Sequence, residues 1–374
     1  HPPRPRQLVL GAQPLETPPQ IQMSAPNNIL IRGVNWLGDA IMALPAIDRL
    51  REAHPEARLT LLTHEKLAGL WEGAEHFNEV LTFEKSESPF IIGQRLREHQ
   101  FDTALILPNS PRSALECWHA NIPRRIGYAS RWRKWFLTDP IAPHPHAVPM
   151  HKRLPLDIEY RITNNLPPEK YPARAHHIHQ YLHLAKQLGA SDEPTAPTLR
   201  LKTPPSKNSG NPKIGLIAGA EYGPAKRWPT AHFIEAAKIL IEKHQAQLLL
   251  LGGKGDVETA TEITEALPAK HTTNLAGKTS LTQLVTTLAE CNAVLTNDTG
   301  PMHVAAAVGT PVIAPFGSTS PELTAPGLPG DNAHQFLRTT APCSPCFLKK
   351  CPIDLRCLNS ITPDQAATAV ARVL

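Results

Sequence analysis

Apolar and polar positions follow one another in two separate series along the chain. The first series predicts buried strands at 27–33, 57–63, 79–84, 101–108 and 124–130, with helical periodicity at 37–55 and 176–190. The second predicts strands at 213–219, 247–253, 272–277, 292–298 and 310–317, separated by helices at 229–244, 256–267, 280–291 and 299–309. Strands that alternate with helices indicate an α/β protein with two doubly wound parallel sheets and a cleft between them.

The stretches outside these series set the expected domain boundaries. Residues 1–26 are rich in proline and predict a disordered leader before a first domain at 27–190. Residues 191–212 are rich in Pro, Ser, Asn and Gly, which is typical of a linker, and a second domain follows at 213–361. Residues 362–374 have apolar positions at helical spacing, and we expect this last helix to pack back on the first domain.

Composition narrows the class of function only slightly. The 374 residues include 38 Lys and Arg against 33 Asp and Glu, which makes a formal net charge of +5. This mild excess suits an anionic substrate or a membrane surface, and it is too small to indicate nucleic-acid binding. No apolar run in the sequence is long enough to cross a membrane.

The turn after the strand at 292–298 has the chemistry of an anion site. Asp298 or Thr299 is expected to cap the helix at 299–309, with Gly300 in the turn and His303 in the first helical turns. A glycine-containing turn exposes backbone N–H groups at the positive end of a helix, where phosphate binds readily. The same residues also fit a well-capped helix without a ligand.

A similar strand-turn-helix lies in the first half of the chain. Gly33 follows the first strand, and Gly38 precedes Asp39 at the expected start of the helix at 37–55, which Pro45 should kink. Asp39 fits two roles, a helix cap or a general base. Because a helix N-terminus lowers the pKa of a carboxylate, we expect Asp39 to be ionised at neutral pH.

Two basic residues occupy the equivalent loop of the second half. Lys226 and Arg227 lie between the strand at 213–219 and the next helix, at the same sheet edge as Asp298. Cations there would neutralise a diphosphate, although two solvated residues in a loop would look the same. The sequence contains no Asp-x-Asp pair, so we expect no metal ion at the diphosphate and no cofactor.

Four stretches, taken in order, resemble one known family. They are "RGVNWLGDAIMALPAIDRLREAHP" (32–55), "AKRWP" (225–229), "NDTGPMHVAAAVGTPVIAPFG" (297–317) and the cysteine-rich tail. The chain is similar to the ADP-heptose:lipopolysaccharide heptosyltransferases of glycosyltransferase family 9, from about residue 27 to the C-terminus. The resemblance implies the GT-B fold, in which two Rossmann-like domains bind the acceptor on the first and the nucleotide-sugar on the second.

The resemblance also implies a mechanism and partners. The sugar would be transferred with inversion in one displacement, with Asp39 as the base and Lys226 holding the donor diphosphate. The implied donor-binding residues are Lys226, Arg227, Asp298, Thr299, Gly300 and His303. The implied partners are ADP-heptose and a lipid-anchored, anionic saccharide acceptor, which would place the protein in the cytoplasm, with peripheral contact at the inner membrane.

A basic and aromatic stretch, "RRIGYASRWRKWF" (124–136), suits that acceptor or its membrane surface. We expect acceptor contacts from Asn35, Arg124, Arg125 and Arg131. Before Lys226 and after the strand at 247–253 the chain departs from its relatives' pattern, so contacts to ribose and adenine stay unassigned.

The six cysteines divide into two groups. Cys117 and Cys291 are expected in the core. The other four crowd into one loop, where they could bind a structural metal ion, pack as reduced thiols or form disulfides, of which a cytosolic donor disfavours the last. They are Cys343, Cys346, Cys351 and Cys357.

Three alternatives compete with this function. Another family 9 glycosyltransferase could use a different nucleotide-sugar or acceptor. A two-lobed ligand-binding protein would share the doubled layout, but such proteins are exported and we find no secretion signal. A dehydrogenase would need a G-x-G-x-x-G motif after a predicted strand, and none is present.

Overall fold

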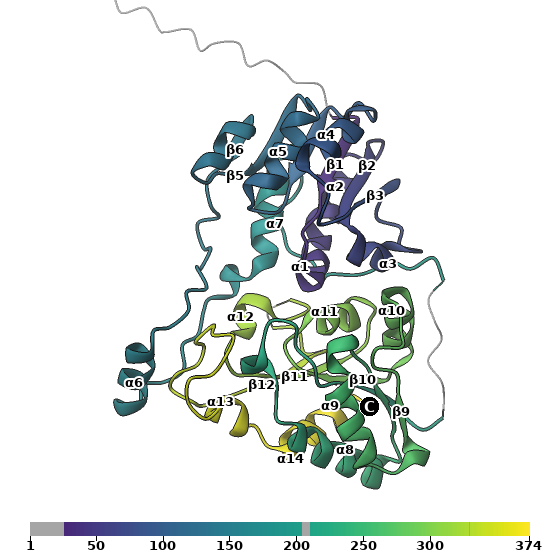
Figure 1. Cartoon of the computed structure of the whole chain (residues 1–374), viewed down its shortest axis with the longest axis vertical. Coiled ribbons are helices and arrows are strands. Elements are labelled where there is room, and N and C mark those ends of the chain that lie inside the picture. Colours follow the sequence, from purple (N-terminus) through teal and green to yellow (C-terminus); the bar gives the residue numbers. More distant parts are fainter. Residues whose placement is uncertain (1–25, 204–209, 329) are drawn as a thin grey trace, which may run out of the picture.

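The computed structural model describes residues 26–203, 210–328 and 330–374. The predicted leader therefore lies outside the described residues, except for residue 26, and so does part of the predicted linker. Within the described residues each half of the chain forms a six-stranded parallel sheet flanked by helices (Figure 1). This arrangement confirms the two doubly wound α/β domains.

The strands and the two helices predicted for the first half are present, and the structure adds further helices between the strands and further elements between residues 139 and 163. Its strands are β1 (Asn28–Arg32), β2 (Arg58–His64), β3 (Glu79–Phe83), β4 (Thr103–Ile106), β5 (Arg124–Tyr128) and β6 (Asp139–Ile141). Its helices are α1 (Leu37–Met42), α2 (Leu44–Ala53), α3 (Ala68–Trp71), α4 (Pro89–Arg97), α5 (Pro111–His119), α6 (Pro155–Thr163) and α7 (His177–Ala185).

The second half repeats the plan. Its strands are β7 (Lys213–Ile217), β8 (Gln247–Leu250), β9 (Thr272–Asn274), β10 (Ala293–Thr296), β11 (Val312–Phe316) and β12 (Gln335–Arg338). Its helices are α8 (Thr230–His244), α9 (Val257–Glu265), α10 (Leu281–Glu290), α11 (Gly300–Ala307), α12 (Pro321–Thr324), α13 (Arg356–Asn359) and α14 (Pro363–Ala371).

The two sheets share one strand order, and that order indicates where a ligand would bind. The first runs β3-β2-β1-β4-β5-β6 and the second β12-β11-β10-β7-β8-β9, which is the same order read from the other side. In each sheet the winding reverses between two central strands, β1 and β4 in one and β7 and β10 in the other. Ligands bind doubly wound sheets at this reversal, outside the carboxyl ends of the strands. In Figure 1, α1 and α11, which follow β1 and β10, face each other between the domains.

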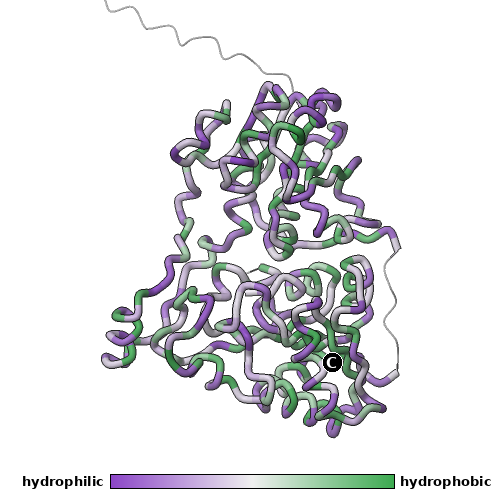
Figure 2. The backbone as a smooth tube through the Cα atoms, viewed as in Figure 1, coloured by the Kyte–Doolittle hydropathy of each residue, from purple (hydrophilic) through white to green (hydrophobic). Residues whose placement is uncertain are grey.

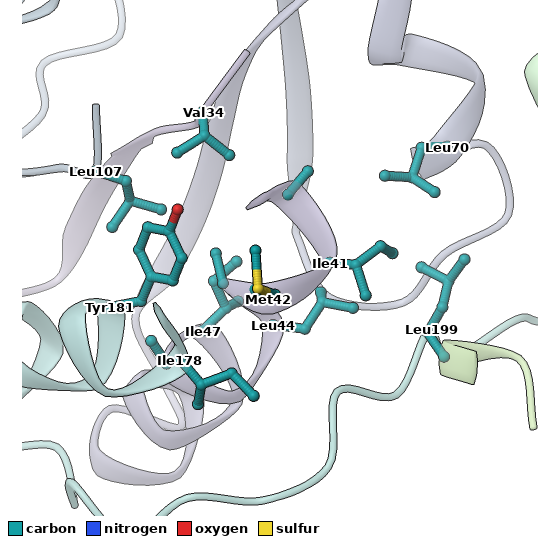
Figure 3. Packing of buried hydrophobic residues seen from close by; sticks show 14 of the residues in the cluster. Val34, Ile41, Met42, Leu44, Ile47, Leu70, Leu107, Ile178, Tyr181 and Leu199 are labelled. Carbon is teal, nitrogen blue, oxygen red and sulfur yellow. The ribbon is translucent and has the colours of Figure 1, made fainter. Parts of the chain in front are cut away.

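Burial explains why the central strands read as continuous apolar runs. Ile29, Leu30 and Ile31 of β1 are all fully buried, because helices cover both faces of a parallel sheet. Figure 2 shows apolar segments inside each domain and polar residues along its outer loops. In Figure 3, Ile178 of α7 lies near Ile47 of α2, and the ring of Tyr181 extends towards Leu107.

The helix predicted at 37–55 is divided rather than kinked. α1 ends at Met42 and α2 begins at Leu44, with Pro45 in the first turn of α2. Proline is tolerated there because the first N–H groups of a helix have no partner within the helix. The break leaves α1 as a short helix whose first turn is directed at the second domain.

The C-terminal helix corrects one prediction. α14 does not cross to the first domain but packs against α8 and the neighbouring strands of the second sheet. Its Ala366, Ala369 and Val370 are buried in the same apolar cluster as Trp228 and Phe233. The apolar stripe identified a helix with a surface to cover, but such a stripe carries no information about which domain supplies that surface.

A different segment crosses between the domains. After β6 the chain runs down to the second domain, where the buried Ile158 of α6 joins the second core, and it returns through α7 (Figure 1). The Arg153 N–H donates to the Cys346 carbonyl at 3.0 Å, and Arg161 Nε donates to the Pro342 carbonyl at 2.7 Å. The first domain is therefore interrupted near its end, which the predicted boundary at 27–190 missed.

The described part of the predicted linker is packed on both domains. The Leu199 N–H donates to the Ala307 carbonyl of α11, and Leu201 pairs with Ala74 of the first domain. In the described part of the chain, no helix is both long and apolar enough to cross a membrane.

Candidate active site

Asp39 lies in the first turn of α1, beyond the carboxyl end of β1. The N-cap position belongs to Trp36, which makes no side-chain cap hydrogen bond, so Asp39 is not the helix cap. The hydroxyl of Tyr181, a residue of α7, donates to Asp39 Oδ1 at 3.1 Å. Tyr181 is itself buried in the first core, so its packing fixes the direction of this hydrogen bond.

The pKa of Asp39 is raised by its surroundings, whereas the sequence analysis predicted that it would be lowered. Burial raises the pKa of this carboxyl above its ordinary value of 3.8, and this effect exceeds the opposing influences of His177, the Tyr181 hydroxyl and Lys226. The prediction that the helix N-terminus lowers this pKa is therefore wrong. Burial destabilises the charged carboxylate by more than the neighbouring groups stabilise it. A raised pKa makes the ionised carboxylate a better proton acceptor near neutral pH.

A buried ion pair shapes the loop that leads to Asp39. Arg32 Nε donates to Glu116 Oε2 at 2.7 Å, with both side chains almost completely buried. The Arg32 Nη1 atom also donates to the Gly33 carbonyl at 2.6 Å and to Asn35 Oδ1 at 3.3 Å. Sequence reasoning missed this pair, because its members are separated by 84 residues and neither stands in a recognisable motif.

The second domain brings Lys226 and Asp298 together. Lys226 ends the short turn Pro224–Lys226 after β7, and Asp298 follows β10. Lys226 Nζ lies 2.7 Å from Asp298 Oδ2, which also accepts from the Thr319 hydroxyl at 2.5 Å. An ammonium group has three donors, so Lys226 keeps donors available for an anion while Asp298 holds it in place.

Asn297, beside Asp298, fastens the Lys226 loop. Its side-chain oxygen accepts from the Trp228 N–H at 2.9 Å, and its side-chain nitrogen donates to the Ala218 carbonyl at 2.6 Å. Asn297 is fully buried. Its side-chain amide therefore joins the loops after β7 and β10 and positions them. Asn297 belongs to the 297–317 stretch, but the sequence alone did not predict this role.

The N-terminus of α11 faces α1 of the first domain. Thr299 occupies the N-cap position, as one of the two predicted alternatives has it, but its side chain makes no cap hydrogen bond. His303 is buried one turn later, and burial lowers its pKa to about 4, so the ring is neutral at pH 7. Its buried Nδ1 has no hydrogen-bond partner. Uncapped N–H groups beside an unpaired imidazole nitrogen suit an anionic, hydrogen-bonding ligand.

Two glycines let α1 and α11 approach each other. A Cβ at Gly38 would lie 2.8 Å from His303 Cδ2, and a Cβ at Gly300 would lie 2.8 Å from Leu37 Cβ. Real Cβ atoms are not found so close to other atoms, so a side chain at either position would separate the helices. The glycines therefore bring Asp39 of one domain and the Lys226–Asp298 pair of the other to one site.

Arg227 lies at the margin of this site. Its Nη2 is 3.9 Å from Asp256 Oδ1, and its buried Nε has no hydrogen-bond partner. Asp256 accepts from the Gly253 N–H at 2.9 Å and fills the space above Gly219 at the end of β7. This carboxylate was not predicted as a site residue, because it stands where the chain departs from the family pattern.

The predicted acceptor residues are divided between two ends of the first sheet. Arg124 and Arg125 begin β5 at the amino edge, away from Asp39. Arg124 pairs with Asp139 at 3.3 Å, and Arg125 donates to the Phe136 carbonyl at 2.8 Å, so both support the sheet. This placement argues against an acceptor role for them. Asn35 and Arg131 are exposed beyond the carboxyl ends of β1 and β5.

Comparison with known proteins decides the family. The profile of glycosyltransferase family 9 (heptosyltransferase) matches residues 90–356. Lipopolysaccharide heptosyltransferase 2 from Salmonella typhimurium is 34% identical over 313 residues, which are 80% of this chain and 85% of the relative. This chain belongs to glycosyltransferase family 9. The corresponding protein of Escherichia coli K12 shows the same identity and coverage.

Solved structures extend the similarity to the fold of this family 9 enzyme. E. coli ADP-heptose lps heptosyltransferase II aligns with a TM-score of 0.71 and 30% identity, over 92% of this chain and 98% of that one. E. coli heptosyltransferase WaaC with ADP has the same fold, with a TM-score of 0.68, 17% identity and coverage of 93% and 100%. The GT-B fold is thus confirmed. Membership of glycosyltransferase family 9 also excludes the two alternatives, a two-lobed ligand-binding protein and a dehydrogenase.

Proposed function

We propose that this enzyme transfers heptose from ADP-heptose to the lipid-anchored inner core of lipopolysaccharide, with inversion at the anomeric carbon. The names of its relatives support the substrates. The observation that carries the proposal is the meeting of Asp39 with Lys226, Asp298 and His303 across the contact between α1 and α11. A carboxylate on one domain and a cationic anion site on the other are what a single displacement between two bound substrates requires.

The reaction follows from these positions. An acceptor hydroxyl oxygen attacks the anomeric carbon of the donor, and the Asp39 carboxylate takes its proton. The bond from the anomeric carbon to the diphosphate oxygen breaks on the opposite side, and ADP leaves with the bonding electrons. Because attack and departure occur on opposite faces, the configuration inverts. Tyr181 holds one oxygen of Asp39, which leaves the other oxygen to accept the proton.

The second domain stabilises the leaving ADP. Negative charge develops on the diphosphate as the bond breaks, and the Lys226 ammonium and the open N-terminus of α11 lie beside each other there. Arg227 adds a second cation at the margin. The neutral His303 ring contributes a hydrogen bond rather than charge, since its pKa of about 4 keeps it unprotonated at pH 7.

A turnover assay tests the substrates. The purified enzyme is incubated with a heptose-Kdo-lipid A acceptor and either ADP-heptose, ADP-glucose or UDP-glucose, and release of the nucleoside diphosphate is measured. We expect turnover with ADP-heptose to exceed the others by at least about 100-fold, because one matched group of buried polar contacts discriminates by that order. Preference for another donor would favour the alternative, a family 9 transferase with a different nucleotide-sugar.

We also propose that a basic and aromatic patch touches the membrane that carries the acceptor. The patch consists of Arg131, Trp132, Lys134 and Trp135, and its two indole rings are 74% and 70% exposed. Between them the buried Arg133 donates to the Ile106 and Pro108 carbonyls, which fixes the patch at the carboxyl edge of the sheet. Exposed tryptophan beside cations is typical of contact with anionic lipid surfaces.

Vesicle co-sedimentation tests this contact. The enzyme should bind vesicles that contain anionic lipid, and the double substitution Trp132→Ala with Trp135→Ala should reduce binding by about tenfold or more, since each ring loses buried apolar area. Phe90→Ala on α4, where the ring is 51% exposed, is the matched control and should change nothing. Equal binding by the double variant would refute the assignment.

A further inference from the structure

A cavity of about 360 Å³ lies between the second domain and the crossing segment, which is the stretch 142–176 that joins β6 to α7. Phe316 and Arg338, the last residues of β11 and β12, line one side of it, and residues 167–170 of the crossing segment line another. In Figure 1, α12 lies on the side of the second domain that the crossing segment passes. The cavity has the volume of a small-ligand site and lies at the carboxyl edge of the sheet, where such ligands bind.

Thr319 connects this cavity with the anion site. It lines the cavity, and its hydroxyl donates to Asp298 Oδ2 at 2.5 Å. The strand order places the cavity beyond β11 and β12, whereas Lys226 and Asp256 follow β7 and β8, on the other side of β10. A ligand in the cavity would therefore lie beside a diphosphate held by Lys226, and both could be bound at once.

The wall that the crossing segment contributes is held in place by its own contacts. The Glu169 N–H donates to the Ser344 carbonyl at 3.0 Å. The Glu169 carboxylate lies 2.6 Å from Arg153 Nη2 and accepts from Arg161 Nη1 at 3.0 Å. A wall fixed in this way loses little conformational freedom when a ligand binds, so the cavity is suited to a specific ligand.

The inner lining offers hydrogen-bond acceptors. Glu322, whose side chain is only 14% exposed, accepts from the Ser320 hydroxyl and pairs with Arg338. The Ser344 hydroxyl donates to the Gly317 carbonyl at 2.7 Å. Because both serine protons are used within the protein, the two serine oxygens and the carboxylate are left to accept from a ligand. A ligand that carries several hydroxyl groups, as a sugar does, matches this lining.

Two cations lie at the rim of the cavity. The Arg338 side chain is 46% exposed and keeps donors beyond those that Glu322 uses. Lys170 also lines the cavity and is exposed, and no carboxylate of a described residue forms an ion pair with it. An anionic acceptor needs such cations, because Arg124 and Arg125 are occupied within the first domain. The rim therefore favours a sugar that carries a negative charge.

We propose that this cavity binds an acidic sugar of the acceptor, next to the sugar whose hydroxyl attacks the donor. The inference rests on the proposed function, from which it takes the acceptor. Hydroxyl groups of the acidic sugar donate to Glu322 and the serine oxygens, and its carboxylate accepts from Arg338 and Lys170. The acceptor then contacts both domains, with its attacking hydroxyl at Asp39 and its acidic sugar on the second domain.

Acceptor kinetics test this assignment. Lys170→Ala combined with Arg338→Gln removes both positive charges and keeps a hydrogen-bond donor opposite Glu322. The KM for a heptose-Kdo-lipid A acceptor should rise by about fivefold or more and respond less to added salt, while ADP affinity in calorimetry stays unchanged. Arg372→Ala, an exposed arginine at the end of α14, is the matched control and should leave this KM unchanged. An acceptor KM of the double variant equal to that of the wild type would overturn the proposal.

A binding measurement separates this proposal from the proposed function. Free Kdo, an acidic sugar, is added to the full chain with ADP present, and saturation transfer from protein to sugar is recorded by NMR. We expect transfer with the wild type and with Arg372→Ala, and a loss of transfer with the double variant. This loss would support the cavity even if the enzyme prefers another nucleotide-sugar, in which case the proposed function alone fails.

The opposite results would overturn the cavity assignment alone. Equal transfer to Kdo with the wild type and the double variant, or no transfer with the wild type, would do so even if heptose transfer is confirmed. If the double variant does not fold, Lys170→Ala alone takes its place, because Lys170 is exposed and its loss leaves no buried group unpaired. This single variant should raise the acceptor KM by about twofold or more, and an unchanged KM would refute the proposal.

Discussion

Replacing Asp39 with Asn isolates the basicity of its carboxylate. The amide has nearly the same shape, and its oxygen can still accept from the Tyr181 hydroxyl, so the first turn of α1 should keep its geometry. What is lost is proton acceptance in the transition state, which contributes about 10²–10⁴-fold. At about 1.36 kcal/mol for each factor of ten, this corresponds to about 2.7–5.4 kcal/mol of barrier. Because burial raises the pKa of Asp39, we expect a loss in the upper half of that range.

Stability should move in the opposite direction to activity. The folded pKa of Asp39 lies above its ordinary value of 3.8, so unfolding releases a proton between these two values and stability falls as pH rises through that window. Above the folded pKa the penalty for the buried charge is complete. The amide of the Asp39→Asn variant would carry no charge, and the midpoint of thermal unfolding at neutral pH should therefore stay unchanged or rise.

The assay combines single-turnover kinetics with thermal unfolding. Asp364→Asn, an exposed carboxylate in the first turn of α14, is the matched control and should leave the rate unchanged. A rate for Asp39→Asn within about threefold of wild type would refute the assignment of the base. A lost rate accompanied by a lower unfolding midpoint would show instead that Asp39 acts through structure.

Three further substitutions test the rest of the site. Lys226→Ala should weaken ADP binding by about 10–100-fold in calorimetry, since a charge-assisted hydrogen bond contributes about 1.5–3 kcal/mol. The control, Lys238→Ala on the exposed face of α8, should leave ADP binding unchanged. Equal ADP affinities of Lys226→Ala and the wild type would place the diphosphate elsewhere. Tyr181→Phe removes a hydrogen bond that lowers the pKa of Asp39, so the acidic limb of the kcat/KM profile should move to higher pH if Asp39 is the base. An unmoved limb would contradict this role of Tyr181. The Cβ of Gly38→Ala would lie 2.8 Å from His303, so this substitution should lower kcat/KM more than it lowers ADP affinity. An unchanged kcat/KM would show that α1 and α11 need not approach each other so closely.

Local sequence patterns predicted the strands and helices that carry the candidate site residues, but not the surroundings of those residues. Asp298, Gly300 and His303 were identified because a strand, a glycine turn and a helix start are adjacent in the sequence, and turn chemistry is local. The pKa direction of Asp39 was wrong, because it depends on burial by residues from α7 and the second domain. Tyr181 was missed for the same reason, since it is 142 residues from the carboxylate that it contacts.

The same division holds for the fold. Periodicity by itself determined the two series of strands and helices, and hence two parallel sheets, because hydrophobic spacing reports which face of an element is buried. Only the tertiary structure decided that α14 covers the second domain, that α6 crosses to it, and that Gly38 and Gly300 let two helices meet. An apolar stripe specifies that a surface must be covered. The choice of partner depends on the shapes and burial of side chains distant in sequence, which no local pattern contains.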